Sequence, residues 1–105
     1  MIEKFHIEIT SEAERDVADI WEYIAEDSPT AATRFVQELQ QKAETLKTFP
    51  LRCPPIPQQP GEDNDYRHLI VGGYRIIFRV SENTVYVVHI LHGSKLLDLN
   101  TNNYS

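Results

Sequence analysis

Residues 74–80, "YRIIFRV", constrain the fold more than any other stretch of the sequence. Side chains of an extended strand point alternately to opposite faces, and here the two alternating sets differ in character. The first set is apolar or aromatic and the second carries two cations; they are Tyr74, Ile76, Phe78 and Val80, and Arg75, Ile77 and Arg79. The pattern predicts a strand with one face in a core. We expect the arginine-bearing face to remain open, because no further element is left to cover it.

Two further apolar runs lie close to this strand in the sequence. Residues 66–71, "YRHLIV", precede it across Gly72 and Gly73, a pair suited to a two-residue hairpin turn. Residues 85–92, "VYVVHILH", follow the turn-forming residues 81–84. Short connections join neighbouring antiparallel strands, so the last third of the chain is predicted to be a three-stranded meander.

The first half of the chain predicts one strand and two helices. Residues 3–9 alternate in polarity, as a half-buried strand does. Ser11 stands three residues before Glu14, a capping-box pattern that predicts the start of a helix. Ser28 and Pro29 suit the cap and the first position of a second helix, which should end before the next proline. We expect the two helices to form an antiparallel hairpin.

Each predicted helix has an apolar stripe that should enter the core. The stripes include both Trp21 and Phe35. The opposite side of the first helix is acidic, and we expect it to be solvated; it carries Glu12, Asp16, Asp19, Glu22 and Glu26. One strand, two helices and then three strands predict an α+β fold, in which the helical hairpin packs on one face of an antiparallel sheet. The length favours a single domain over residues 1–105.

The net charge of −6 is unevenly distributed. Residues 1–65 hold 14 acidic and 6 basic side chains, whereas residues 66–105 hold 2 acidic and 4 basic ones and three of the four histidines. Two halves of opposite charge suggest two surfaces with different partners. The acidic total argues against strong unspecific binding to nucleic acid, which needs a row of cations to displace counterions.

Other features of the sequence bound the compartment and the chemistry. The single cysteine, Cys53, fits a reducing compartment, and no stretch approaches the roughly 20 apolar residues that span a bilayer. We therefore expect a cytoplasmic protein without a membrane partner. Because the histidines do not cluster with other ligands, we expect no metal and no cofactor. Residues 50–65 hold five of the six prolines and predict a long loop, which is either functional or a tolerated surface insertion.

The strand cations have two possible roles. Arg67, Arg75 and Arg79, with neighbouring apolar residues, would form a mixed surface of the kind that binds a partner. Alternatively, they pair with Glu8, Glu82 or the acidic part of the loop and only solubilise the sheet.

Four stretches together resemble the RelE/ParE toxins of bacterial type II toxin–antitoxin systems. They are "TSEAERDVADIWEYIA" and "SPTAATRF" in the predicted helices, and "YRIIFRV" and "VVHILHGSK" in the predicted strands. The resemblance covers nearly the whole chain and implies the β-α-α-β-β-β fold of that family. It also implies the toxin component of a plasmid stabilisation system, held inactive by a cognate antitoxin that wraps across the toxin.

Two activities divide that family: RelE-like members cut mRNA on the ribosome, and ParE-like members poison DNA gyrase. The chain departs from the RNA-cutting pattern, which has arginine where Ile70 stands and a tyrosine where Thr101 stands. The segment "ILHGSK" resembles the end of the last strand in the ParE-like branch. We therefore expect a gyrase inhibitor rather than an enzyme, with a homologue that only binds its partner as a further alternative.

The resemblance also implies which residues act. The expected partner-binding residues are Arg67, Arg75, Arg79, His92 and Lys95. In the RelE-like alternative, a ribosome-dependent endoribonuclease, the catalytic residues would be Arg75, Arg79, His92 and Lys95, with His92 as a candidate acid or base. A structural hydrogen-bonding role for His92 is the simpler interpretation.

Overall fold

The computed structural model describes residues 4–56 and 66–93 and contains one four-stranded sheet. The strands lie in the order β1-β4-β3-β2; their bounds are β1 His6–Ile9, β2 Arg67–Val71, β3 Tyr74–Ser81 and β4 Thr84–His92. The last three strands form the predicted antiparallel meander, and β1 pairs parallel to β4. The predicted α+β fold is confirmed, with the difference that the sheet is mixed rather than wholly antiparallel.

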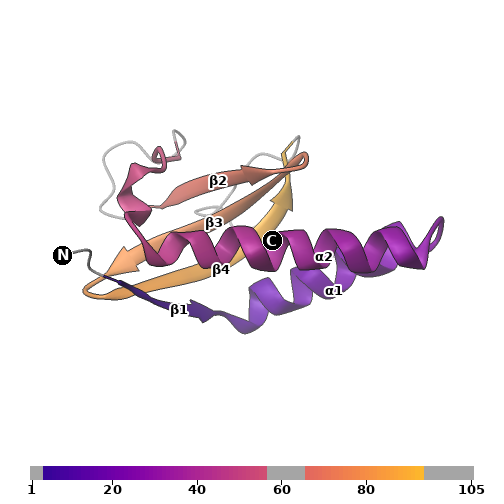
Figure 1. Ribbon diagram of the computed structural model, residues 1–105, viewed down its shortest axis with the longest axis horizontal. Coiled ribbons are helices and arrows are strands. Elements are labelled where there is room, and N and C mark those ends of the chain that lie inside the picture. Colours follow the sequence, from indigo (N-terminus) through magenta and orange to yellow (C-terminus); the bar gives the residue numbers. More distant parts are fainter. Residues whose placement is uncertain (1–3, 57–65, 94–105) are drawn as a thin grey trace, which may run out of the picture.

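Two antiparallel helices cover one face of this sheet (Figure 1). They are α1, Ser11–Ala25, and α2, Pro29–Glu44, and their common tip extends beyond the strands. A 3₁₀ turn at Thr45–Lys47 continues α2, and a second one follows at Pro50–Arg52. Neither helix is long and apolar enough to span a membrane within the part of the chain that the structure describes.

The first helix is capped one residue earlier than the sequence predicts. The N-cap is Thr10, whose hydroxyl oxygen accepts a hydrogen bond from the Ala13 N–H at 3.1 Å. Thr10 also donates its own N–H to the Val87 carbonyl at 3.0 Å, so it is the last extended residue beside β4 and takes the cap position from Ser11. The predicted start of α2 is confirmed, with Ser28 as N-cap and Pro29 as the first helical residue.

The main core lies between the helices and the sheet. Its most buried side chains come from both layers; they are Ala13, Leu46, Ile76, Phe78, Val85 and Val87. Phe35 packs against this core as predicted, and its ring also fixes the β2–β3 turn: a Cβ on Gly72 (φ +54) would lie 2.9 Å from Phe35 Cε1. Trp21 was expected in the core, but its side chain is exposed, and its Nε1–H donates to Thr33 Oγ1 at 3.2 Å.

The second face of the sheet is only partly open, which corrects the expectation that nothing covers it. Ile77 is fully buried there with Ile56, and Tyr66, Val88 and Leu91 pack around them. Residues 54–56 run beside β2, because Ile56 N–H donates to the Tyr66 carbonyl and His68 N–H to the Pro54 carbonyl. Part of the predicted loop 50–65 therefore forms an apolar cover, and residues 57–65 lie outside the described part.

A β-bulge changes the facing of side chains along β4. Ile77 lies opposite His89, but the next residue, Phe78, lies opposite Val87, so Val88 is the extra residue. Val87 consequently faces the main core and Leu91 the second cluster. Simple alternation along residues 85–92 would instead put Val87, His89 and Leu91 on one face, and the bulge removes Val87 from that set.

Candidate functional site

Arg75 and Arg79 lie on the second face of β3, which we call the arginine face. Their neighbours Ile76 and Phe78 are buried in the main core, so alternation directs both guanidinium groups away from the helices. Arg79 is exposed, and its guanidinium carbon lies 5.0 Å from the centre of the Tyr86 ring, a cation–π contact. The structure thus places these two predicted site residues on one face.

Arg75 is held by a histidine that the sequence did not single out. Its Nη1 lies 3.1 Å from His68 Nδ1 on β2. Because arginine can only donate, Nδ1 must be the acceptor, and the ring hydrogen of the neutral imidazole is on Nε2. Burial, and then the neighbouring Arg75 charge, lower the pKa of His68 from its ordinary value of 6.5. At neutral pH the arginine face therefore carries guanidinium charges and a neutral imidazole.

The lowered pKa of His68 makes stability depend on pH. Below pH 6.5 the unfolded chain protonates this histidine, whereas the folded protein resists protonation until the lower folded pKa is reached. The free energy of unfolding should therefore fall as the pH falls through this window and should be unaffected by His68 above it. Urea unfolding of wild type and His68→Gln between pH 5 and 8 measures the effect. The wild type should lose more stability on acidification; parallel pH profiles would contradict the assignment.

Arg67 does not reach the arginine face. It lies opposite Phe78 across the β2–β3 pair, so its side chain is on the helix side of the sheet. There its Nη1 donates to the Cys53 carbonyl at 2.7 Å, while its Nε is buried without a hydrogen-bond partner among the described residues. The expected grouping of Arg67 with Arg75 and Arg79 is therefore wrong, and the contact it makes braces the segment that precedes residue 54.

His92 is also separate from the arginine face. It is exposed at the end of β4, and its ring packs edge-on against Tyr74 with the ring centres 5.1 Å apart. Tyr74 packs against the main core, and His92 lines a groove beside α1. The structure therefore does not bring His92 together with Arg75 and Arg79. The fifth predicted residue, Lys95, lies outside the described residues.

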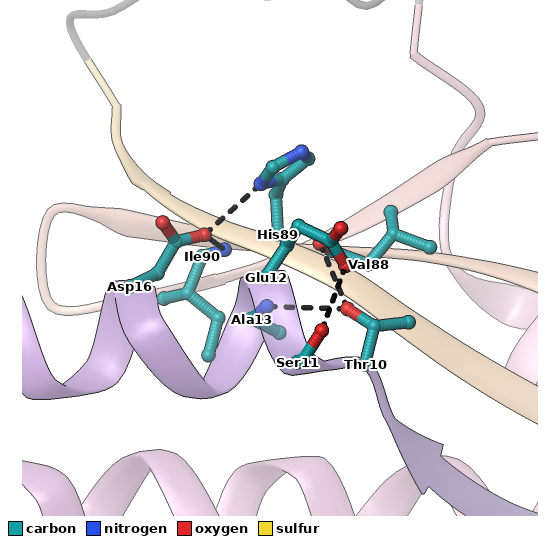
Figure 2. Close-up of polar contacts among 8 residues, drawn as sticks. All are labelled: Thr10, Ser11, Glu12, Ala13, Asp16, Val88, His89 and Ile90. Atoms are coloured by element: carbon teal, nitrogen blue, oxygen red, sulfur yellow. Dashed lines mark hydrogen bonds and ion pairs between the residues drawn. The ribbon is translucent and has the colours of Figure 1, made fainter.

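An aspartate that was expected to be solvated instead joins α1 to the sheet (Figure 2). Asp16 Oδ2 accepts a hydrogen bond from Ile90 N–H at 2.9 Å and lies 3.0 Å from His89 Nδ1. The partner strand β1 ends at Ile9, opposite Val87, so the Asp16 carboxylate satisfies an edge amide that β1 does not reach. Its position three residues after Ala13 and four before Ile20 indicates from the sequence that Asp16 borders the apolar stripe, although it does not identify the residues that Asp16 contacts.

Removing this carboxylate should destabilise the protein. Asp16→Ala leaves the partly buried Ile90 amide without its acceptor, which costs about 1–3 kcal/mol. Urea unfolding at pH 7 measures the loss, and Glu22→Ala, on the exposed side of the same helix, is the matched control, expected to change stability by less than about 0.5 kcal/mol. Equal effects of the two substitutions would show that Asp16 is only a surface residue.

Metal binding and a cysteine nucleophile would each need a particular arrangement of the described residues. Among residues 4–56 and 66–93, no three His, Cys, Asp or Glu side chains come close enough together to hold a metal ion. The buried thiol of Cys53 has a raised pKa, because desolvation outweighs the nearby Arg52 and Arg67 charges, so it is a poor nucleophile at neutral pH. The arginine face remains as a surface with two cations around an apolar cluster.

Comparisons with known proteins agree with this fold. The sequence model of the family described as "ParE toxin of type II toxin-antitoxin system, parDE" matches residues 7–97. Among solved structures, a chain of the chromosomal ParDE toxin–antitoxin system from P. aeruginosa is similar, with a TM-score of 0.70 and 20% identity over 86% of this chain and 97% of that one. A chain of the toxin–antitoxin complex RelBE2 from Mycobacterium tuberculosis has a TM-score of 0.63 and 20% identity over 88% and 94%. No curated protein sequence matches. At this identity the two structures establish a common fold.

Proposed function

This chain belongs to the ParE toxin family of type II toxin–antitoxin systems, and we propose that it inhibits DNA gyrase when free and that a cognate antitoxin neutralises it. Both similar structures come from toxin–antitoxin systems, which supports an antitoxin as the partner. In this proposal the protein acts in the cytoplasm, where gyrase is found, as the toxin of a plasmid stabilisation system.

The observation that carries the antitoxin part of the proposal is the state of the two arginines on the arginine face. Among residues 4–56 and 66–93, neither Arg75 nor Arg79 forms an ion pair with a carboxylate. Glu82, the nearby acid that could have neutralised them, forms no ion pair within that part of the chain either. Pairing with Glu8 or Glu82 is therefore not seen among the described residues, while the acidic part of the loop, the third alternative, lies outside them.

The surroundings of the two arginines indicate what the partner presents. Arg75 is oriented by His68 and Arg79 by Tyr86, so both guanidinium groups are held in place before a partner arrives. Between them the cluster around Ile77 offers apolar surface. A segment that places carboxylates over the arginines and apolar side chains over this cluster would suit the face, since a guanidinium binds a carboxylate through two parallel hydrogen bonds.

The RelE-like alternative needs a different arrangement. Cleavage of RNA at a ribose 2′-hydroxyl requires a base, an acid and a cation around one phosphate. Here His92 lies beside α1, on the other side of the sheet from Arg75 and Arg79. These residues do not converge on one phosphate, which favours inhibition by binding over ribonuclease activity.

Expression in a bacterium tests the proposal. Inducing the chain alone should stop growth, produce chromosome breaks and leave transcripts intact, and co-expression of the antitoxin gene beside it should restore growth. Transcripts cut at codon boundaries with unbroken chromosomes would instead establish the RelE-like ribonuclease. Normal growth, with the folded chain present in the cell extract, would overturn both toxin activities and leave a homologue that only binds its partner.

A further inference from the structure

A groove lies beside α1 on the helix side of the sheet, and neither Arg75 nor Arg79 is among its lining residues. It has a volume of about 630 Å³. It runs between α1 and the C-terminal end of β4, next to the start of β3. We call it the α1 groove; its lining residues include Asp19, Ile20, Tyr23, Ile24, Ile90 and His92. Ile20 and Ile90 are buried members of the main core, so the floor of the groove is apolar and firmly packed.

The rim of the groove on α1 is acidic. The helix carries five acidic side chains against one basic one. Asp19 is exposed and, within residues 4–56 and 66–93, its carboxylate forms no hydrogen bond or ion pair. The Tyr23 side chain lies one helical turn further along and is 73% exposed. A carboxylate without a partner among the described residues and an exposed aromatic ring therefore lie side by side above apolar surface.

The wall of the groove is fixed in place by the Asp16 contact. Asp16 also lines the groove, and its hydrogen bond with Ile90 N–H ties α1 to β4, the two elements that form its sides. The Asp19 carboxylate is thus presented by a helix that is tied to the strand. A partner would not have to order these elements on binding, which lowers the entropic cost of association.

We propose that the α1 groove binds a basic amphipathic segment of a second protein. Apolar side chains of that segment would pack on Ile20 and Ile90, and a Lys or Arg would reach Asp19 while its charge lies over the Tyr23 ring. An acidic segment would be repelled by α1, and a wholly apolar one would bury the Asp19 carboxylate without a partner. The chemistry of this partner is the opposite of that expected at the arginine face, so the inference goes beyond the proposed function.

Two labelled peptides of twelve residues test the charge requirement. One alternates leucine and lysine and the other leucine and glutamate, and binding is followed by fluorescence anisotropy. The lysine peptide should bind and the glutamate peptide should not. Its affinity should also fall with added salt, because the screening length shrinks from roughly 10 Å at 0.1 M to 3 Å at 1 M. Equal binding of both peptides, or no binding of the lysine peptide, would overturn the proposal.

Matched variants locate the binding. Asp19→Lys should weaken the lysine peptide by about tenfold, as expected when an attraction becomes a repulsion of similar size. Glu38→Lys makes the same charge change at an exposed position of α2 outside the groove, and it should weaken binding by less than about twofold. Equal losses in the two variants would show unspecific charge attraction and would reject the groove as the site.

A further measurement separates a foreign partner from a second copy of the chain. In sedimentation of the protein alone, we expect no self-association that depends on Asp19. If the wild type self-associates and Asp19→Lys abolishes this, another copy of the chain fills the groove, and the assignment to a second protein is overturned. None of these measurements needs an antitoxin or gyrase. A negative result in these binding measurements therefore does not bear on the proposed function. Equally, a negative result for the proposed function does not bear on binding at the α1 groove.

Discussion

The double variant Arg75→Glu/Arg79→Glu should lose most of its affinity for the cognate antitoxin. Each arginine is expected to contribute a charge-assisted hydrogen bond to a partner carboxylate, and such a bond is worth about 1.5–3 kcal/mol. Two such losses correspond to a reduction in affinity on the order of a hundredfold or more. Isothermal titration calorimetry with the cognate antitoxin measures the change.

The matched control is Arg15→Glu/Arg34→Glu, which makes the same charge change on the two helices. Both of these arginines are exposed, and neither lies on the arginine face. The control should change the affinity by less than about tenfold, through long-range electrostatics alone. Urea unfolding of both double variants verifies that they are folded. Unchanged affinity in a folded Arg75→Glu/Arg79→Glu protein would refute the role of the arginine face.

Phe78→Ala should cause the largest loss of stability among single substitutions in the sheet. Phe78 is fully buried in the middle of β3, where its ring joins the helices to the strands. Replacing a buried Phe by Ala removes apolar contacts and leaves a cavity, which costs about 3–5 kcal/mol. A domain of this size is stabilised by only about 5–15 kcal/mol, so much of the protein's stability should be lost.

Phe49→Ala provides the control with the same chemical change. The Phe49 side chain is 61% exposed and contributes little burial, so the expected change in unfolding free energy is within about 0.5 kcal/mol. Urea unfolding at pH 7 compares the two variants with the wild type. Similar losses for Phe78→Ala and Phe49→Ala would mean that the core does not lie between the helices and the sheet as described.

The elements of the fold could be predicted because each has a strong local pattern. The alternation in residues 74–80 and the glycine pair before it set the β2–β3–β4 meander, and Ser28 with Pro29 set the start of α2. The start of α1 was misplaced by one residue because Thr10 and Ser11 are both good caps, and only the hydrogen bond from Thr10 to β4 distinguishes them.

The faces of the site residues could be predicted only where side chains alternate regularly along a strand. Alternation holds on β3, where Ile76 and Phe78 enter the main core and Arg75 and Arg79 lie on the opposite face, as predicted. Arg67 was misplaced although the sequence held the signal: the predicted two-residue turn at Gly72 and Gly73 sets Val71 opposite Tyr74, and this register puts Arg67 opposite Phe78, on the helix side. The bulge at Val88 has no local signal, and it reverses the facing of the residues after it.

The contacts of Asp16 and His68 could not be predicted from local patterns. Each depends on residues far away in the chain or on a neighbouring strand: Asp16 contacts residues 89 and 90, and His68 contacts Arg75. The partial covering of the arginine face by Ile56 has the same origin, since a proline-rich segment gives no strand pattern of its own. In each case tertiary packing decides what the residue does.

Purified DNA gyrase tests directly whether the chain inhibits this enzyme. In a supercoiling reaction that contains the folded chain, cleaved linear plasmid should accumulate, and adding the cognate antitoxin beforehand should prevent this. Intact plasmid and normal supercoiling at a molar excess of the folded chain would contradict the claim that this toxin acts on gyrase.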